Sequence, residues 1–274
     1  MKVKQKINTA LGRTTGFELV RVRGPRRRRP VIRGERLLKQ PVFLLSSVRS
    51  GSTLLRVILD SHSQLFAPHE LHLGDIEAKA KGWFAEHAMS DLGFDNNELT
   101  ALLWDRLLDE ALRRSGKKVL VEKTPNQVFR TKRLLDIWPD ARFVFLLRHP
   151  ASILASWREA RPQLSRDEAI TDILRYLTSL QEAREQLTGV DVRYEDLTER
   201  PEEETRRLCE FLGVEWEASM LEYGDNGHTK FRRGLGDWSE KINSGRLQPA
   251  RPVPDDVPDE FTSFCTAWGY DRSD

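Results

Sequence analysis

The stretch Pro41-Val-Phe-Leu-Leu-Ser-Ser-Val-Arg-Ser-Gly-Ser-Thr53 decides how we interpret this chain. Its apolar half, residues 42–45, is typical of a buried strand, and a loop of mostly small residues follows at 46–52. Apolar residues then recur at helical spacing over 54–59. A strand that turns directly into a helix points backbone N–H groups and a helix N-terminus at one place. That geometry favours a bound anion, most often a phosphate.

The loop carries one fixed positive charge, Arg49, and two hydroxyl groups at its helix end, from Ser52 and Thr53. It lacks the lysine with which ATP- and GTP-hydrolysing proteins reach the terminal phosphates. The next buried strand, 143–147, ends in Arg148-His149-Pro150, where such proteins would carry a magnesium-binding aspartate. The pattern therefore predicts a phosphorylated ligand that is bound without a metal ion. An ordinary turn between strand and helix is the alternative.

Four segments, in order, resemble the motifs of sulfotransferases that use 3′-phosphoadenosine 5′-phosphosulfate (PAPS). Residues 47–55 resemble the loop that binds the 5′-phosphosulfate. Arg148-His149-Pro150, followed by Ser156, resembles the motif that binds the 3′-phosphate. Glu122-Lys123-Thr124-Pro125 resembles the Lys-x-Pro segment of the tyrosylprotein sulfotransferase-like branch, and 192–197 resembles a family strand whose tyrosine lies near the nucleotide. The resemblance spans about residues 41–250.

The resemblance implies a three-layer, P-loop-like α/β fold with a central, mostly parallel sheet flanked by helices. It implies in-line transfer of a sulfuryl group from PAPS to an acceptor hydroxyl or amine, without a metal ion and with 3′-phosphoadenosine 5′-phosphate (PAP) as product. Lys123 and Arg49 would lie against the leaving phosphate. The nucleotide-binding residues that the resemblance implies are Arg49, Ser50, Gly51, Ser52, Thr53, Arg148, Ser156, Tyr194 and, in a loop at 231–246 whose alignment is ambiguous, Lys241 and Ser244.

The segment Ala67-Pro-His-Glu-Leu-His72 offers three candidates for the catalytic base. Glu70 aligns with a glutamate of the tyrosylprotein-like branch, whereas cytosolic small-molecule sulfotransferases use a histidine. A histidine titrates near neutral pH, and a glutamate would need burial to raise its pKa. We expect Glu70 to be the base, and His72 and His69 remain alternatives, as does a surface turn without a catalytic part.

Lys123 comes at the end of an expected buried strand, at the edge where open α/β sheets bind their ligands. A surface pair between Lys123 and Glu122 is the alternative to a role at the leaving group. Because neighbouring side chains on a strand point to opposite faces, the strand geometry argues against that pair.

Alternating strand and helix patterns predict a parallel sheet. The expected strands lie at 42–46, 119–122, 143–147 and 190–194, and the expected helices at 53–61, 98–114, 127–137, 151–160, 167–187 and 201–212. Residues 222–254 are expected to form a long loop over the site. The acceptor pocket is expected from 62–95 and 160–185, and the sequence indicates neither a particular acceptor nor an oligomeric state.

The 274 residues have a net charge of +2, but the charge is unevenly distributed, because residues 1–40 hold 13 Lys and Arg against two Glu. We expect a mobile basic arm at 1–35, able to dock on an acidic partner, and a sulfotransferase domain at 36–274; a solvated tail is the alternative for the arm. The two cysteines exclude a disulfide framework and favour a cytoplasmic setting. The chain has no apolar run of the ~20 residues that a transmembrane helix needs.

Two alternatives to a sulfotransferase remain, and they belong to other functional classes. An atypical P-loop kinase would turn over ATP with magnesium, which the missing lysine and aspartate disfavour. A non-catalytic protein that binds nucleic acid through the basic arm would show salt-sensitive binding to DNA or RNA. The net negative charge of the part beyond the arm argues against the second function.

Overall fold

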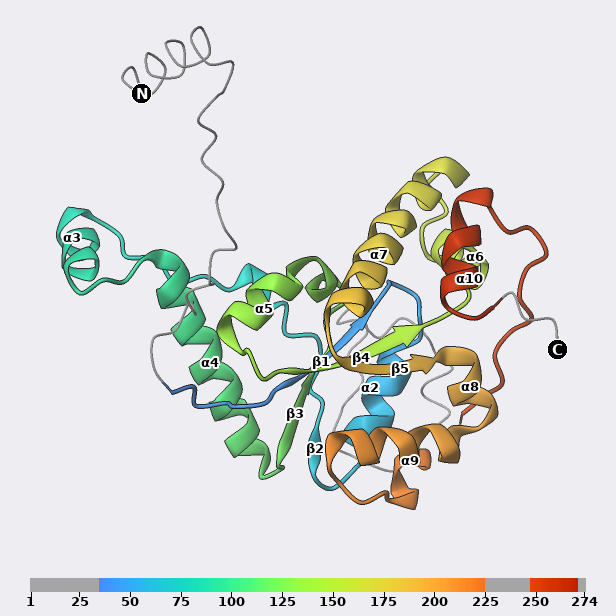
Figure 1. Cartoon of the computed structure of the whole chain (residues 1–274), viewed down its shortest axis with the longest axis horizontal. Helices are drawn as coiled ribbons and strands as arrows, with labels where there is room; N and C mark the ends of the chain where they lie inside the picture. Colours follow the sequence, from blue (N-terminus) through green and yellow to red (C-terminus); the bar gives the residue numbers. More distant parts are fainter. Residues whose placement is uncertain (1–34, 225–246, 271–274) are drawn as a thin grey trace, which may run out of the picture.

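The computed structural model describes residues 35–224 and 247–270, and in this part of the chain five strands form one sheet (Figure 1). Their order is β2-β3-β1-β4-β5, and every neighbouring pair is parallel. The strands are β1 (Val42–Ser46), β2 (Leu65–Phe66), β3 (Val119–Glu122), β4 (Arg142–Leu147) and β5 (Gly189–Arg193). The expected parallel sheet is confirmed, and the two-residue strand β2 is an addition to it, since a segment so short has no periodicity to detect.

The helices of the described part are α2 (Ser52–Asp60), α3 (Trp83–Asp91), α4 (Asn96–Ser115), α5 (Thr131–Ile137), α6 (Pro150–Ala160), α7 (Arg166–Gln186), α8 (Tyr194–Glu199), α9 (Pro201–Leu212) and α10 (Thr262–Ala267). Short 3₁₀ turns lie at η1 (Leu73–Asp75), η2 (Pro125–Arg130), η3 (Ala218–Leu221) and η5 (Asp259–Phe261). Capping boxes begin the two longest helices, with Asp95 and Glu98 at α4 and Ser165 and Glu168 at α7.

Two expected elements need correction. The helix expected at 127–137 is divided, because its first part belongs to the 3₁₀ turn η2 and only α5 is α-helical. Tyr194, expected to end a strand, is instead the first residue of α8, where Glu195 and Asp196 place negative charge in the first turn and so favour a helix N-terminus.

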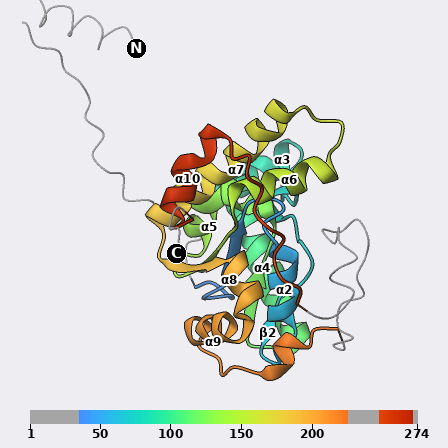
Figure 2. The same cartoon turned by 90° about the vertical axis from the view of Figure 1, so that its right-hand side faces the viewer.

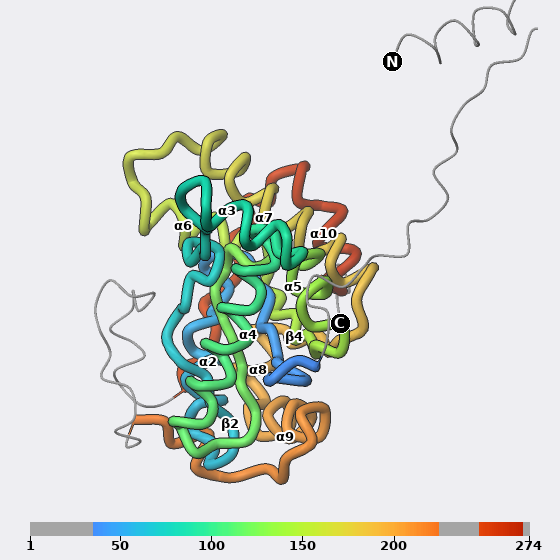
Figure 3. The backbone as a smooth tube through the Cα atoms, turned by 90° about the vertical axis from the view of Figure 1, so that its left-hand side faces the viewer, coloured from blue at the N-terminus to red at the C-terminus, as the bar shows by residue number. Residues whose placement is uncertain are grey.

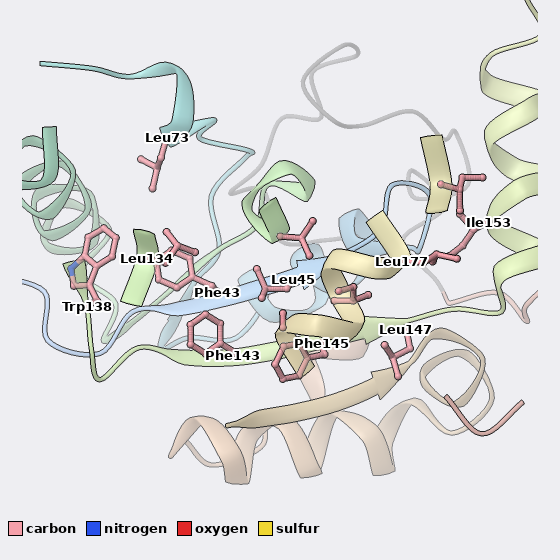
Figure 4. Packing of buried hydrophobic residues seen from close by; sticks show 14 of the residues in the cluster. Phe43, Leu45, Leu73, Leu134, Trp138, Phe143, Phe145, Leu147, Ile153 and Leu177 are labelled. Carbon is pink, nitrogen blue, oxygen red and sulfur yellow. The ribbon is translucent and has the colours of Figure 1, made fainter. Parts of the chain in front are cut away.

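Side chains alternate between two apolar clusters along the central strands, as the pleat of a strand requires. In β1, Phe43 and Leu45 join one cluster, and Val42 and Leu44 join the other. The first cluster, shown in Figure 4, packs the sheet against α4, α5 and α7. The second packs it against α2 and α9. Helices therefore cover both faces of the sheet, which confirms the three-layer α/β fold.

The turned views show how the two outer layers are placed. In Figures 2 and 3, α7 and α10 lie together at one end of the molecule, and α9 lies at the other. Trp268, which ends α10, donates a hydrogen bond to Gln181 of α7 at 2.8 Å. The C-terminal segment of the described chain is thereby held against α7.

The strand order places a topological switch point beside β1. The chain goes from β1 to β2 and β3 on one side, then crosses to β4 and β5 on the other. In open α/β sheets, ligands bind at such a point, outside the carboxyl ends of the strands. The ends of β1, β3 and β4, followed by Ser47, Lys123 and Arg148, meet there.

In residues 35–224 and 247–270, no helix combines the length and apolar character needed to span a bilayer. The basic residues 1–34 lie outside the described part, so the division into arm and domain stays a prediction, and so does the cytoplasmic setting. Most of the expected loop over the site, residues 225–246, also lies outside it, and these residues include Lys241 and Ser244.

Candidate active site

The loop after β1 has the conformation of an anion-binding turn. Arg49 and Gly51 both have positive φ, 60° and 87°, and α2 begins at the next residue, Ser52. The side-chain hydroxyls of Ser47 and Ser50 are buried and have no hydrogen-bond partner among the described residues. Buried polar groups without a partner are rare, and here they belong to the loop between β1 and α2. The loop therefore contains hydrogen-bonding capacity that the described part of the protein does not use.

Arg49 and Arg148 come from different strand ends and meet at this loop. The Arg148 guanidinium donates from Nη1 to the carbonyl oxygen of Arg49 at 2.9 Å, and Arg49 Nε donates to Ser156 Oγ of α6 at 3.0 Å. Burial, with the nearby charge of Arg148, lowers the pKa of Arg49. In the described part, neither guanidinium forms an ion pair with a carboxylate. Two like charges are thus held together in a pocket that favours an anion.

Tyr194 connects the loop to the second arginine. The Arg148 guanidinium lies over its ring, 4.4 Å from the centroid. A Cβ atom built on Gly51 would come within 2.3 Å of the ring, so the backbone of the loop approaches the tyrosine as closely as a glycine permits. Because Gly51 also has φ +87°, both the close approach and the backbone conformation require glycine here.

A second group of charged side chains lies at the end of β3. Lys123 Nζ forms an ion pair with Glu70 Oε1 at 2.5 Å, and it lies 3.4 Å from Thr53 Oγ1 at the start of α2. His72 Nε2 lies 3.3 Å from the other oxygen of Glu70. The side chains of Lys123 and Glu70 are 1% and 11% exposed, whereas that of His72 is 45% exposed. The histidine is therefore on the solvent side of the carboxylate and the lysine on the inner side.

Burial acts on the charged groups at this strand end. It lowers the pKa of Lys123, while the Glu70 carboxylate partly restores it. The neighbouring Glu122 is fully buried, and burial raises its pKa to about 7 although Thr124 donates a hydrogen bond to it. The ion pair of Lys123 is thus with Glu70 and not with Glu122, as the alternating strand geometry predicted.

One cavity of about 680 Å³ joins the two groups. Its volume is in the range of small-molecule sites. The described residues of its wall include Arg49, Gly51, Ser52, Thr53, Glu70, His72, Arg148, Ser156 and Tyr194. Ser50 and Lys123 are buried behind this wall, and His69 is not among its residues.

One predicted contact differs from the structure. The spacing of eight residues between Arg148 and Ser156, which share one motif, suggested that the Ser156 hydroxyl returns to Arg148, but the hydroxyl accepts its hydrogen bond from Arg49. The turn after β4 sets this outcome, because Pro150 begins α6 immediately and the helix carries Ser156 toward the loop after β1.

The cavity has wall residues that the sequence interpretation did not single out, although Tyr176 lies in the range 160–185 expected for the acceptor pocket and 248–254 in the expected loop over the site. Asn126 and Tyr176 line it together, and the tyrosine hydroxyl donates to Asn126 Oδ1 at 2.6 Å. Trp157 and the segment 248–254 line it as well, and Arg251 of this segment pairs with Glu159 of α6 at 2.7 Å. A helical signal was available for α6, since Ser152, Ser156 and Glu159 share one face; none marked Tyr176.

The comparisons with known proteins agree with this geometry. The profile of the Sulfotransferase family matches residues 41–218, which is well over half of the chain. The chain belongs to the Sulfotransferase family. Membership assigns it to a class of transferase enzymes, and the matched range contains the loop after β1, the end of β3 and the end of β4.

Three similar proteins illustrate the match. Nodulation protein NoeE of Sinorhizobium fredii is 27% identical over 208 residues, covering 63% of this chain and 50% of the relative. A putative protein-tyrosine sulfotransferase of Caenorhabditis briggsae is 23% identical over 200 residues, covering 68% of this chain and 69% of the relative. The solved sulfotransferase domain from the curacin biosynthetic pathway superposes with a TM-score of 0.62 at 23% identity, covering 85% of this chain and 99% of the domain.

The match with the nodulation protein spans about half of that relative's length. The superposition on the curacin domain covers nearly all of that domain, so the fold of the described part is that of a sulfotransferase domain.

Proposed function

We propose that this protein transfers a sulfuryl group from PAPS to an acceptor hydroxyl or amine. The observation that carries the proposal is the joint placement of Arg49 and Arg148 on one cavity wall with Glu70 and His72. Among the described residues, neither cation forms an ion pair with a carboxylate, although Glu159 lies near enough to Arg49 to raise its pKa against the effect of burial. An anion with more than one phosphate would supply negative charge to both arginines. The carboxylate with its histidine is what an acceptor proton needs nearby.

The residues present suit the nucleotide part of PAPS. The loop after β1 offers backbone N–H groups at the start of α2 and the buried hydroxyls of Ser47 and Ser50. Arg148 is assigned to the 3′-phosphate, because its Nε atom is buried without a hydrogen-bond partner in the described part. Tyr194, stacked against Arg148, is assigned to the wall beside the nucleotide. When bound, PAPS supplies the sulfuryl group and a phosphate leaving group.

Lys123 connects the two halves of the proposed reaction. Its ammonium has three N–H donors, and Glu70 and Thr53 lie within reach of two of them. A third donor remains for the leaving phosphate oxygen, where negative charge develops during transfer. The assignment of Lys123 to the leaving group thus rests on its contact with Thr53 of the phosphate loop.

Glu70 is assigned as the group that accepts the acceptor's proton. Its carboxylate is held by Lys123 on the inner side and by His72 on the outer side, so its position on the cavity wall is fixed. His72 is the next candidate, because it also lines the cavity. Glu70 and the arginines proposed to bind PAPS line one cavity, and this arrangement favours in-line transfer. In such a transfer, the positioning of the reactants supplies much of the rate acceleration.

A thermal-shift titration tests the nucleotide half. We expect PAP without metal to stabilise the protein in a concentration-dependent manner, because a ligand that binds only the folded state raises its melting temperature. ATP with magnesium is the matched comparison, since it tests the P-loop kinase alternative. Stabilisation by ATP with magnesium but not by PAP would contradict the proposal. Release of PAP from PAPS in the presence of a panel of phenols, alcohols and amines then tests the transfer itself.

A further inference from the structure

We infer that Thr124 is a positioning residue, which connects the buried Glu122 to the backbone of His72 and so holds the proposed base pair Glu70–His72 in place. This inference rests on the proposed function of the cavity. None of the roles proposed above uses Glu122 or Thr124, although both are almost completely buried at the end of β3, with 1% and 2% of their surface exposed.

Two hydrogen bonds carry the inference. Thr124 Oγ1 donates to Glu122 Oε1 at 2.6 Å, and the same oxygen accepts from the backbone N–H of His72 at 3.2 Å. A hydroxyl has one proton and two lone pairs. Because its proton is used on the glutamate, its lone pairs face the histidine N–H. Glu122 thus fixes the direction in which the threonine can act.

The backbone that receives this hydrogen bond is strained. His72 has φ 46° and ψ 45°. This left-handed conformation is energetically unfavourable for any residue other than glycine. Such a conformation persists only when its surroundings impose it. The preceding loop is anchored at Ala67, through Asp60 and Arg56, and at Leu71, whose backbone forms a hydrogen bond with Glu122. Thr124 adds the hydrogen bond to the strained residue His72 itself.

The strained residue is in direct contact with the reacting group. The His72 side chain lies 3.3 Å from Glu70, and Glu70 is paired with Lys123, the residue immediately before Thr124. One strand end therefore holds the carboxylate by an ion pair and the histidine by a hydrogen bond. Loss of the second contact leaves Glu70 on the wall but frees His72 to leave the left-handed conformation.

The test compares Thr124→Val, which keeps the shape and removes the hydroxyl, with Thr124→Ser, which keeps the hydroxyl. The first readout is amide hydrogen exchange of peptides from 67–76, measured without ligand. We expect faster exchange in Thr124→Val and exchange close to the parent protein in Thr124→Ser, because only the first variant loses the acceptor of the His72 N–H. Equal exchange in all three proteins would overturn the inference.

The second readout is turnover of PAPS with whichever acceptor of the panel the parent protein uses best. Thr124→Val should lower kcat about 10–100-fold, as small displacements of reacting groups do, with the Kd for PAP unchanged. Combined with Glu70→Gln, it should add little to the loss from Glu70→Gln alone, because both changes act on one unit. If the losses in kcat of the two single variants were fully additive in free energy, Thr124 would act independently of Glu70, and its role would be in the stability of the fold.

Thr205 is a matched control in α9, on the other face of the sheet and away from the cavity. It is fully buried, donates to the carbonyl of Pro201 at 2.7 Å and accepts from Trp216 Nε1 at 2.9 Å. Thr205→Val removes a comparable pair of hydrogen bonds, so it should lower the melting temperature and leave kcat unchanged. A parent protein that neither binds PAP nor uses PAPS would refute the proposed function, whereas a normal parent with an unaffected Thr124→Val would refute only the positioning role.

Discussion

The two ends of the cavity handle charge in opposite ways. At the end built by β1 and β4, neither Arg49 nor Arg148 forms an ion pair with a carboxylate of the described residues, and Glu159 offsets only part of the effect of burial on Arg49. At the end built by β3, Lys123 and Glu70 neutralise each other at 2.5 Å. The first end is suited to bind an anion, whereas the charges at the second end are already paired with each other. The difference indicates that changes at the first end should be seen in donor binding and changes at the second in turnover.

The largest expected effect is at Glu70. Glu70→Gln keeps the shape of the side chain but removes its ability to accept a proton and its ion pair with Lys123. We expect turnover of PAPS to fall by about 10²–10⁴, the usual contribution of a general base, with the Kd for PAP unchanged in calorimetry.

Glu77→Gln is the control, because Glu77 is half exposed and forms an ion pair with Lys79 at the surface. Near-normal turnover in Glu70→Gln would show that Glu70 is not the base, and His72 would then be the candidate.

The next effect concerns pH and Glu122. Burial raises the pKa of this carboxyl from 4.5 to about 7 in the folded protein, so the folded state holds the proton more tightly than the unfolded state. The stabilisation is complete below pH 4.5 and is lost as the pH rises through 7. The loss corresponds to about 3 kcal/mol.

Urea denaturation of the parent protein and of Glu122→Gln at several pH values measures this term. The free energy of unfolding of the parent should fall relative to the variant between pH 4.5 and 7, and the difference should be constant above pH 8. Parallel pH profiles would contradict the raised pKa of Glu122.

A smaller effect is expected at the end that receives the anion. Arg148→Met should weaken PAP binding by about 1.5–3 kcal/mol, because a charge-assisted hydrogen bond to phosphate is lost. Arg158→Met on α6 is the control, since that side chain is exposed and does not line the cavity. Calorimetry with PAP measures both, and equal affinities in the two variants would break the comparison between the two ends.

The smallest effect is expected at Gly51. Gly51→Ala places a Cβ against Tyr194 at a residue with φ +87°, and should cost about 1–3 kcal/mol of stability together with some PAP affinity. Gly213→Ala is the control, because it has a similar φ, +72°, but nothing within 4 Å of the added carbon. Thermal unfolding compares the two variants. An equal loss of stability would show that the Tyr194 ring moves aside without cost.

The parts of the fold that were predictable have strong local signals. The apolar runs of β1 and β4 and the residues that follow them could be recognised in the sequence, because fully buried parallel strands are continuously hydrophobic. The short strand β2 and the helix α3 could not. β2 has two residues, and none of the nine residues of α3 is buried, so no core-facing pattern marks that helix.

The residues of the candidate site show the same contrast between local signals, which the sequence reveals, and long-range contacts, which it does not. Arg148 and Lys123 directly follow strands, and Arg49 lies in the loop that follows β1, so a sequence that predicts the strands also places these residues at one edge of the sheet. Contacts between distant elements were not predictable in this way. The hydrogen bond from Tyr176 to Asn126 joins α7 to η2 across 50 residues, and the pairing of Ser156 with Arg49 depends on the direction in which α6 leaves the sheet.

Arg49 and His72 are the two non-glycine residues with positive φ in residues 35–224 and 247–270, and each borders one end of the cavity. Substitution of either by glycine would relieve an unfavourable backbone conformation. Attempts to make this protein more heat-resistant by relaxing such positions would therefore act directly on its working parts. Greater robustness would have to come from elsewhere, such as the exposed surface of α4.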